Sequence, residues 1–265
     1  HTGLIVFPSF KTTWHFDNKV AQKYLFELIK APLVPSYAFY DKKTALEWAN
    51  NTEYPKVFKL KGGAGSANVK LVKNRSQARR VIRKGFNKGF PNFDRWNTLK
   101  ERFRKFRNGK VSFFEIVKGI IRLVYAPYYD RVLGREVGYV YFQDFIPDLD
   151  HDIRIIVINN KAIGIKRYVR QNDFRASGSG LLEYNREAFP LEMIKAAFEL
   201  ASKLNLQSAA LDFVETNSNI QLIEISYGFP AKGFTDNCPG YWDSDLNWNP
   251  GEIDPQAWMV DTVME

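Results

Sequence analysis

The stretch SAALDFVETNSNIQLIEIS, residues 208–226, predicts two β-strands joined by a turn at residues 217–219. Both strands are rich in apolar residues, yet Asp212 and Glu224 place one carboxylate in the middle of each. Carboxylates on neighbouring strands repel each other unless a cation lies between them, and oxygen ligands suit Mg²⁺. The stretch therefore predicts a hairpin that carries a magnesium site.

Ion pairing within the protein is an alternative explanation for the two acids. Arginines such as Arg167 and Arg175 would then neutralise them, and both readings stay open from the residues alone. The three histidines are scattered along the sequence and support neither a zinc site nor a catalytic triad; they are His1, His15 and His151.

A second hairpin is predicted by PKVFKLKGGAGSANVKLV, residues 55–72, whose tip is rich in glycine. Backbone N–H groups of such a tip can approach an anion closely because no Cβ intervenes, and Lys59 and Lys61 add positive charge. The sequence contains neither the P-loop motif nor the dinucleotide-binding glycine motif. We interpret the stretch as a phosphate cradle, with an ordinary hairpin turn as the alternative.

The composition is that of a folded protein of one domain or two packed lobes, with 265 residues of which 45% are hydrophobic. A single cysteine, Cys238, cannot form an internal disulfide, so we expect a cytoplasmic location. The net charge is +9, but residues 79–135 alone contain 16 Lys and Arg against four acids. The basic character therefore belongs to one segment.

The order of predicted elements favours an α+β fold over a doubly wound parallel sheet. We expect a helix over residues 18–30 capped by Asp17, another that begins at Ser76, and a long one that follows Pro190. Two basic amphipathic helices are expected within a loop-rich insertion, over residues 99–108 and 112–125. No period is evident in the Trp-rich tail that follows Pro230.

Taken together, the two hairpins and the segment VYFQDFIPDLDHDIRIIVINNKAIGIKRYVRQNDFRASGSG, residues 140–180, resemble the ATP-grasp superfamily. Within it, the chain is most similar to RimK-type amino-acid ligases, with glutathione synthetase as a neighbouring branch. The resemblance covers residues 17–84 and 140–233, and it implies an ATP-grasp fold of two α+β lobes that hold ATP between them. We expect residues 1–145 to form the N-terminal segment and the first lobe, with the insertion at about 85–138, and residues 146–265 to form the second lobe.

The resemblance also implies roles for individual residues. Three residues match catalytic positions: Lys59 matches the strand lysine that contacts the α- and β-phosphates, and Arg167 and Arg175 match arginines near the transferred phosphoryl group and the acceptor carboxylate. The metal ligands would be Asp212, Glu224 and Ser226. The implied nucleotide-binding residues are Lys19, Lys59, Lys61, Gly62, Gly63, Gly65, Ser66, Asp144, Phe145, Asp152 and Ser177.

Two positions depart from the family pattern. The third metal ligand is usually asparagine, where this chain has Ser226, and a hydroxyl binds Mg²⁺ more weakly than an amide carbonyl. Ala176 replaces a polar residue of the family's Arg-Ser-Asn motif, which leaves the substrate undefined.

The function implied by the resemblance is that of a carboxylate–amine ligase, which forms an amide through an acyl-phosphate and uses ATP with Mg²⁺, or with Mn²⁺ as an alternative ion. We expect it to join an amino acid to an acidic or glycan substrate, as in polysaccharide biosynthesis. The alternatives are a phosphotransferase that acts on a polyanionic hydroxyl substrate and a non-catalytic polyanion-binding protein. The sequence does not define an oligomeric state.

The basic insertion permits two readings. Its helices either pack their Phe and Ile side chains on the first lobe, or contact a partner such as an acidic substrate or a membrane surface. We do not expect nucleic acid as a partner.

Overall fold

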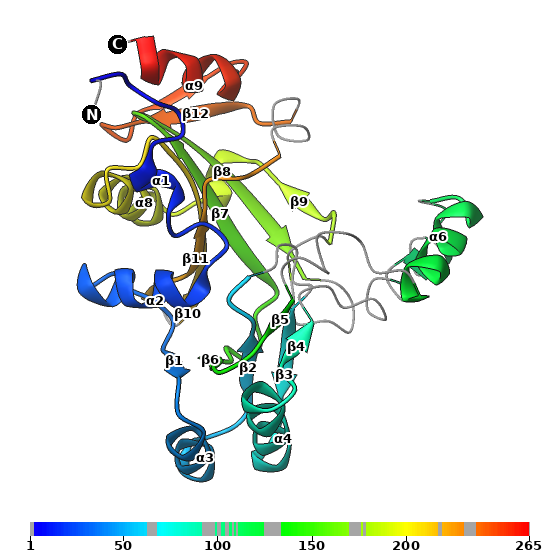
Figure 1. The fold of residues 1–265 in the computed structure, drawn as a ribbon. Helices are drawn as coiled ribbons and strands as arrows, with labels where there is room; N and C mark the ends of the chain where they lie inside the picture. Colours follow the sequence, from blue (N-terminus) through cyan, green and yellow to red (C-terminus); the bar gives the residue numbers. More distant parts are fainter. Residues whose placement is uncertain are drawn as a thin grey trace. The chain divides into compact units, whose positions relative to one another are not determined.

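A computed structural model of the chain describes residues 3–62, 68–91, 99, 102–103, 106–107, 109, 111–124, 134–169, 176, 179–216, 219–230 and 237–264. The chain forms two compact units (Figure 1), one of residues 35–145 and the other of residues 1–34 together with 146–265. We expected residues 1–34 to belong to the first lobe, whereas their contacts group them with residues 146–265.

The unit of residues 35–145 is built on an antiparallel sheet with the strand order β1-β6-β2-β3. Its strands are β1 (Ser36–Phe39), β2 (Lys56–Lys59), β3 (Val69–Val72) and β6 (Val140–Asp144). Strands β2 and β3 form the predicted glycine-tipped hairpin, in which Lys59 pairs with Val69. Phe58 and Phe142 lie opposite each other in register and contribute to a buried core with helices α3 (Lys42–Asn51) and α4 (Arg75–Phe86).

Helices α3 and α4 each begin at a side-chain cap. The cap of α3 is Asp41, which accepts a hydrogen bond from the Thr44 backbone N–H at 2.7 Å. The cap of α4 is Asn74, which accepts from the Gln77 backbone N–H, so the expected start at Ser76 is wrong by one position. Asn74 takes this role because its extended backbone and short amide reach the first free N–H groups of the helix.

The basic insertion contains the short paired strands β4 (Phe90–Pro91) and β5 (Arg135–Glu136) and the helix α6 (Phe113–Val124). Helix α6 matches the second of the two predicted amphipathic helices. The first was expected over residues 99–108, of which the structure describes residues 99, 102–103 and 106–107, all of them helical.

The other unit is built on a larger antiparallel sheet, for which the described residues give the order β11-β10-β7-β8-β12-β13, with β9 beside β8. Its central strands are β7 (His151–Ile158), β8 (Lys161–Tyr168), β10 (Ser208–Thr216) and β11 (Asn219–Ser226). The shorter strands are β9 (Leu182–Glu183), β12 (Gly240–Asp243) and β13 (Trp248–Pro250). The hairpin β10–β11 confirms the pairing predicted for residues 208–226, and β7 and β8 form a second hairpin.

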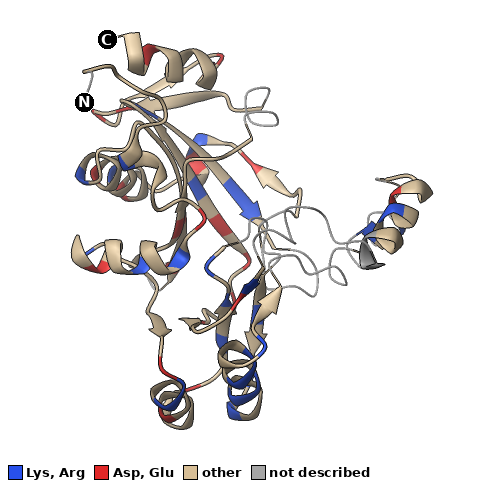
Figure 2. Cartoon of the chain, viewed as in Figure 1, with Lys and Arg blue, Asp and Glu red and all other residues tan. Residues whose placement is uncertain are grey.

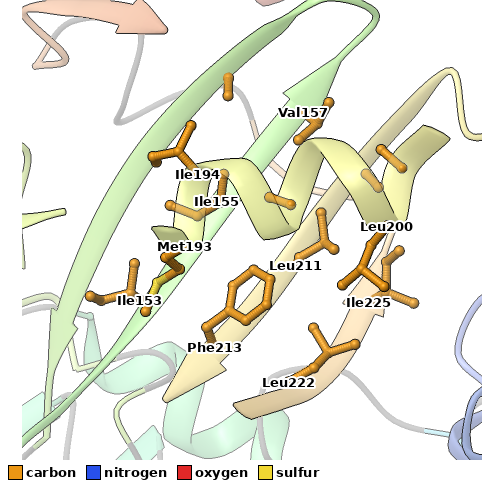
Figure 3. Close-up of a cluster of buried hydrophobic side chains, with 14 of the residues drawn as sticks. Ile153, Ile155, Val157, Met193, Ile194, Leu200, Leu211, Phe213, Leu222 and Ile225 are labelled. Atoms are coloured by element: carbon orange, nitrogen blue, oxygen red, sulfur yellow. The ribbon is translucent and has the colours of Figure 1, made fainter. Parts of the chain in front are cut away.

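Alternation along the strands gives this sheet two different faces. One face carries Ile153, Ile155, Leu211 and Phe213, which pack against Met193 and other residues of helix α8 (Leu191–Lys203), as Figure 3 shows. The opposite face carries a second apolar cluster that includes Ile156, Ile158, Ile163 and Ile165, packed against Ile253 and residues of helix α9 (Pro255–Met264). Toward the other end of the strands, charged residues such as Asp152, Arg167 and Asp212 continue this second face.

The N-terminal segment closes the edge of the larger sheet. Gln22 of helix α2 (Lys19–Leu28) donates to the Ile225 carbonyl at 2.7 Å and accepts from the Ile225 N–H at 3.3 Å, so its amide substitutes for a neighbouring strand. Leu33 forms a parallel bridge with Leu222, and Phe26 is buried in the α8 core. These contacts explain why residues 1–34 belong to this unit. The short helix α1 (Phe10–Thr13) precedes α2.

The cap of α2 differs from the prediction. Asn18 accepts from the Ala21 N–H at 3.1 Å, whereas the expected cap, Asp17, has a φ of 49°, in the left-handed region outside the helix. The tail also differs, because the segment without a sequence period folds into β12, β13 and α9. In the described part of the chain, no helix has the length and apolar content needed to cross a membrane.

Candidate active site

Charged side chains gather on the second face of the larger sheet, at the end that the α9 cluster leaves uncovered. Asp152 and Arg154 alternate with the core residues Ile153 and Ile155 of β7, so both side chains point to this face. Their strand neighbours continue the row, because Asp212 pairs in register with Arg154, and Arg167 pairs with Asp152. Red and blue segments mark these strands in Figure 2.

A β-bulge brings Glu224 to the same face. Asp212 lies opposite Glu224 in register, while the next residue, Phe213, lies opposite Leu222, so Ile223 is the extra residue of β11. Regular alternation would place Glu224 on the same face as Leu222, which is buried in the α8 core. The bulge turns Glu224 toward Asp212, and bulges of this kind are common beside functional sites.

Asp212 is fully buried and held by two guanidinium groups. Arg154 donates to both carboxylate oxygens, at 2.7 and 2.8 Å, and Arg167 Nη2 lies 3.0 Å from Oδ2. Burial alone would raise the pKa of Asp212, but the paired Arg154 and Arg167 outweigh it and hold the pKa well below its usual range. Arg167 was one of the predicted partners of the acids, whereas a role for Arg154 was not predicted.

Asp152 and Arg167 form a second buried pair. Arg167 Nε and Nη2 donate to the two oxygens of Asp152, at 2.5 and 2.9 Å. Burial favours loss of the Arg167 proton, but the carboxylates of Asp212 and Asp152 more than compensate and raise its pKa. The two N–H groups of Arg167 Nη1 have no hydrogen-bond partner among the described residues, so this nitrogen can still donate to a ligand.

Lys19 links Glu224 to the N-terminal segment. The Lys19 ammonium lies 3.6 Å from Glu224 Oε2 and 4.0 Å from Asp17 Oδ1. The Glu224 side chain is one-third exposed, so its carboxylate stays accessible to a ligand. Ser226, the third predicted metal residue, donates its hydroxyl to the Gly228 carbonyl at 2.9 Å, which leaves only oxygen lone pairs for an ion.

These donors suit a magnesium ion that obtains part of its coordination from a substrate. An ionised carboxylate has about four acceptor positions, and the arginines occupy three of those of Asp212, so one remains on Oδ1. Glu224 supplies two more oxygens. In the described part of the chain, no group of three or more His, Cys, Asp or Glu side chains is placed to hold a metal by itself. Oxygens from a bound phosphate would complete the octahedral coordination that Mg²⁺ requires.

The smaller unit holds the predicted site residue Lys59 on its sheet. Lys59 is buried and donates to Gln143 Oε1 at 2.6 Å, and Gln143 Nε2 in turn lies 3.1 Å from Ser36 Oγ. Gln143 thus fixes the ammonium of Lys59, a role that the sequence analysis missed although Gln143 directly precedes Asp144. These side chains lie on the face of the sheet opposite the Phe58 core.

Asp144 occupies a different environment from Lys59. Its carboxylate accepts from Lys56 Nζ at 2.6 Å, and its backbone N–H donates to the Pro35 carbonyl at 2.9 Å. Lys56 alternates with Val57, so Asp144 and Lys56 share the face that carries Phe58. The side chain of Asp144 is therefore committed to Lys56, and Phe145 follows it at the end of the unit.

The base of the glycine-rich loop is fixed at both ends. The Lys61 backbone N–H donates to the Tyr139 hydroxyl at 2.7 Å, and Asn68 Nδ2 donates to the Gly62 carbonyl at 3.2 Å. Lys61 Nζ lies 3.6 Å from Glu136. Five predicted site residues, Gly63, Gly65, Ser66, Arg175 and Ser177, lie outside the described residues.

No protein-family model matches this sequence, and no curated protein sequence matches it. Solved structures do match. A RimK-domain ATP-grasp protein from Sphaerobacter thermophilus superposes with a TM-score of 0.54 over 96% of this chain and 69% of that protein, at 14% identity. The chain has the ATP-grasp fold.

Two further structures of this fold are similar to the chain. The ATP-grasp ligase PsnB, in complex with a minimal precursor, gives a TM-score of 0.55 at 14% identity, over 99% of this chain and 64% of PsnB. The biotin carboxylase domain of 2-oxoglutarate carboxylase from Hydrogenobacter thermophilus was solved in complex with MgADP, ADP and bicarbonate. It superposes with a TM-score of 0.55 at 14% identity, over 97% of this chain and 47% of that protein. The chain thus spans less than two thirds of the length of PsnB. These similarities confirm the predicted α+β fold of the ATP-grasp type.

Proposed function

We propose that the chain is an ATP- and Mg²⁺-dependent carboxylate–amine ligase that works through an acyl-phosphate. The observation that carries the proposal is the pairing of Asp212 with Glu224 across a bulge, beside Lys19 and Arg167. This arrangement offers a nucleotide both carboxylate ligands for its metal and cations for its phosphates. The ATP-grasp fold supports a nucleotide as the ligand, since the similar biotin carboxylase domain was solved with MgADP.

The reaction that we propose has two steps. A substrate carboxylate oxygen attacks the γ-phosphorus of ATP, the bond to ADP breaks, and an acyl-phosphate forms. An amine nitrogen then attacks the acyl carbon, phosphate leaves with the bonding electrons, and the amine loses its proton to solvent or to phosphate. The first step converts a poor leaving group, O⁻ of a carboxylate, into a good one.

The residues of the chain would stabilise charge on the phosphates. Lys59 and Lys19 supply ammonium groups, and Arg167 supplies the two Nη1 donors that the ion pairs leave available. Asp212 and Glu224 would hold Mg²⁺, which supplies charge neutralisation and orientation of the phosphate oxygens. We propose that Asp152 acts by positioning Arg167, because both of its carboxylate oxygens accept hydrogen bonds from that side chain.

The remaining predicted residues are assigned on the family resemblance. We propose that the loop at residues 62–68, with Lys61 at its base, covers the phosphates and excludes water that would hydrolyse the acyl-phosphate. The backbone of Asp144 and Phe145 would contact adenine, since the Asp144 carboxylate is engaged by Lys56. Arg175 and Ser177 would contact the acceptor substrate. We propose an amino acid as one substrate and an acidic glycan as the other.

The test uses the full chain with ATP, Mg²⁺ and a panel of amino acids and uronic acids. ADP release should depend on the acid, and hydroxylamine added in place of the amine should trap the acyl-phosphate as a hydroxamate. Glu224→Gln should lower turnover at least about 100-fold. Glu215→Gln, on the exposed part of the same hairpin, is the matched control and should keep full activity.

Lys59→Ala should cause a comparable loss, with Lys70→Ala on the neighbouring strand β3 as its control. Formation of a phosphorylated hydroxyl product, with no hydroxamate, would instead identify a phosphotransferase. ADP release that Glu224→Gln leaves unchanged would remove the site assignment.

A further inference from the structure

Helix α6 exposes a continuous apolar face. The exposed fractions are 60% for Phe113, 74% for Phe114, 52% for Ile120 and 53% for Ile121, and Val117 is also exposed. Helical residues three or four positions apart lie on one side, so these five residues share one side of α6. We call them the α6 apolar face.

The opposite side of α6 is the one that packs within the insertion. Ile116 is buried, and a side chain at Gly119 would meet Leu99 and Arg102 at 2.9 and 3.1 Å. Arg102 also donates to the Glu115 carbonyl at 2.9 Å and pairs with the Glu115 carboxylate. These contacts fix the rotation of α6 about its axis and turn the apolar face outward.

This arrangement decides between the two readings of the insertion. In the first interpretation, the Phe and Ile side chains of the insertion pack on the first lobe. Four Phe and Ile side chains of α6 are nevertheless more than half exposed. Among the described residues, Phe113 of this face packs edge-on against Phe106, with 6.1 Å between the ring centroids. Burying such a surface against a partner would be favourable.

The charge of the sequence segment that contains the α6 apolar face identifies the partner chemistry. Residues 99–124 contain eight Lys and Arg against two Glu, and the Lys118 side chain is 62% exposed. One of the two acids, Glu115, is neutralised by Arg102 and Lys118. An apolar helix face bordered by basic side chains is the pattern of helices that lie in the surface of an anionic membrane.

We propose that the α6 apolar face docks onto the surface of a bilayer that contains anionic phospholipid. The helix has 12 residues, about 18 Å at 1.5 Å per residue, which is far short of a bilayer core of about 30 Å. It therefore lies in the plane of the interface, with Phe and Ile side chains among the acyl chains and basic side chains at the headgroups. This proposal does not depend on the ligase activity.

Flotation of the full chain with vesicles tests the proposal. One set of vesicles is phosphatidylcholine alone, and the other contains about one third phosphatidylglycerol. The chain should float with the anionic vesicles, and raised salt should weaken the association. Phe114→Ser combined with Ile121→Ser should reduce binding at least about tenfold, because two side chains that enter the acyl region are lost.

Leu28→Ser is the matched control, since Leu28 is 81% exposed but lies on α2, and it should bind like the parent chain. Lys118→Glu should weaken binding to anionic vesicles only. Flotation that the α6 double variant leaves unchanged would overturn the proposal, and so would equal binding to neutral vesicles. Circular dichroism checks that each variant is folded. If the parent chain fails to float but forms dimers that the double variant dissociates, the α6 apolar face contacts protein and the membrane proposal is wrong.

Discussion

Arg154 and Arg167 share the buried carboxylate of Asp212, and Arg154 supplies two of the three hydrogen bonds. The sequence identified Asp212 because an acid interrupts an apolar strand. It also contained a signal for Arg154, since Asp152 and Arg154 are two residues apart in β7 and must point to one face. The partner strand of that face could not be read from the sequence, because register depends on the packed sheet.

Arg154→Ala should destabilise the protein by about 1–3 kcal/mol, because it removes two charge-assisted hydrogen bonds from a buried carboxylate. The pKa of Asp212 is held low in the folded protein, so the stability that its ionised form contributes is present above the unfolded pKa of about 3.9. It is lost as the pH falls below that value. Urea titrations should therefore show the largest difference from the parent near pH 6–7, and a smaller one below about pH 4.

An Arg186→Ala variant provides the comparison for that experiment, because Arg186 lies outside the charged row. A stability difference for Arg154→Ala that is constant from pH 7 to pH 3 would contradict the assigned ion pair.

Among the secondary-structure elements, strand β8 depends on a glycine at its centre. A Cβ at Gly164 would lie 2.7 Å from two ring carbons of Phe189, the residue that precedes Pro190 and helix α8. The ring packs directly on the strand backbone, and the aromatic side chain has little freedom to move within this core.

Gly164→Ala should lower the free energy of unfolding by about 1–3 kcal/mol through overpacking. The double variant Gly164→Ala with Phe189→Leu should lose less stability than the two single variants lose in sum, because the smaller side chain at position 189 makes room for the methyl group. Thermal denaturation of the four proteins measures this coupling. Additive effects of the two substitutions would contradict the steric contact.

Gln22 connects helix α2 to the edge strand β11. Its amide both donates to and accepts from the backbone of Ile225, and it also donates to the His15 carbonyl at 3.1 Å. Gln22→Ala should cost about 1–3 kcal/mol, because it leaves buried backbone groups without partners. Hydrogen exchange should show faster exchange of the Ile225 amide, while the Leu211 amide in β10 keeps its protection. Unchanged exchange at Ile225 would show that α2 does not cover this edge.

At the scale of the whole molecule, the charges of the second face determine how a metal ion can bind. Each carboxylate there already has a cationic partner, so Mg²⁺ alone must compete with Arg154, Arg167 and Lys19. A nucleotide brings phosphate oxygens that complete the coordination and attract the same cations. We therefore expect calorimetry to detect Mg²⁺ binding at least about tenfold tighter with a non-hydrolysable ATP analogue than without it. Equal affinities would contradict a shared site, and Glu224→Gln should abolish the difference.

Local patterns in the sequence predicted most of the fold. The apolar strand pattern of residues 208–226 predicted the hairpin β10–β11, and the glycine-tipped pair β2–β3 followed from its turn residues. The α9 segment was missed because its apolar residues lack a helical period on their own. The unit to which residues 1–34 belong was missed because it depends on contacts such as that of Gln22 with Ile225, some 200 residues away.

Only the part of the site that local sequence patterns reveal could be predicted. Asp212 and Glu224 stand out as acids in apolar strands, and the structure brings them together in register. The bulge at Ile223 could not be foreseen, because simple alternation places Glu224 with the core residue Leu222. Arg154 and Gln143 were missed because their importance depends on which side chain lies across the sheet from them.

The discontinuous unit has a consequence for biosynthesis. Helix α2 leaves the ribosome before residues 35–145, whereas its backbone partner Ile225 is translated after all of them. At 5–20 residues per second, the interval from residue 34 to residue 226 is roughly 10–40 s. During that time Phe26 has no core to enter, so the nascent chain must keep an unpaired amphipathic helix from aggregating while the intervening unit folds first. Slow synthesis across residues 146–226 would therefore favour binding of this helix by a chaperone that recognises exposed apolar segments.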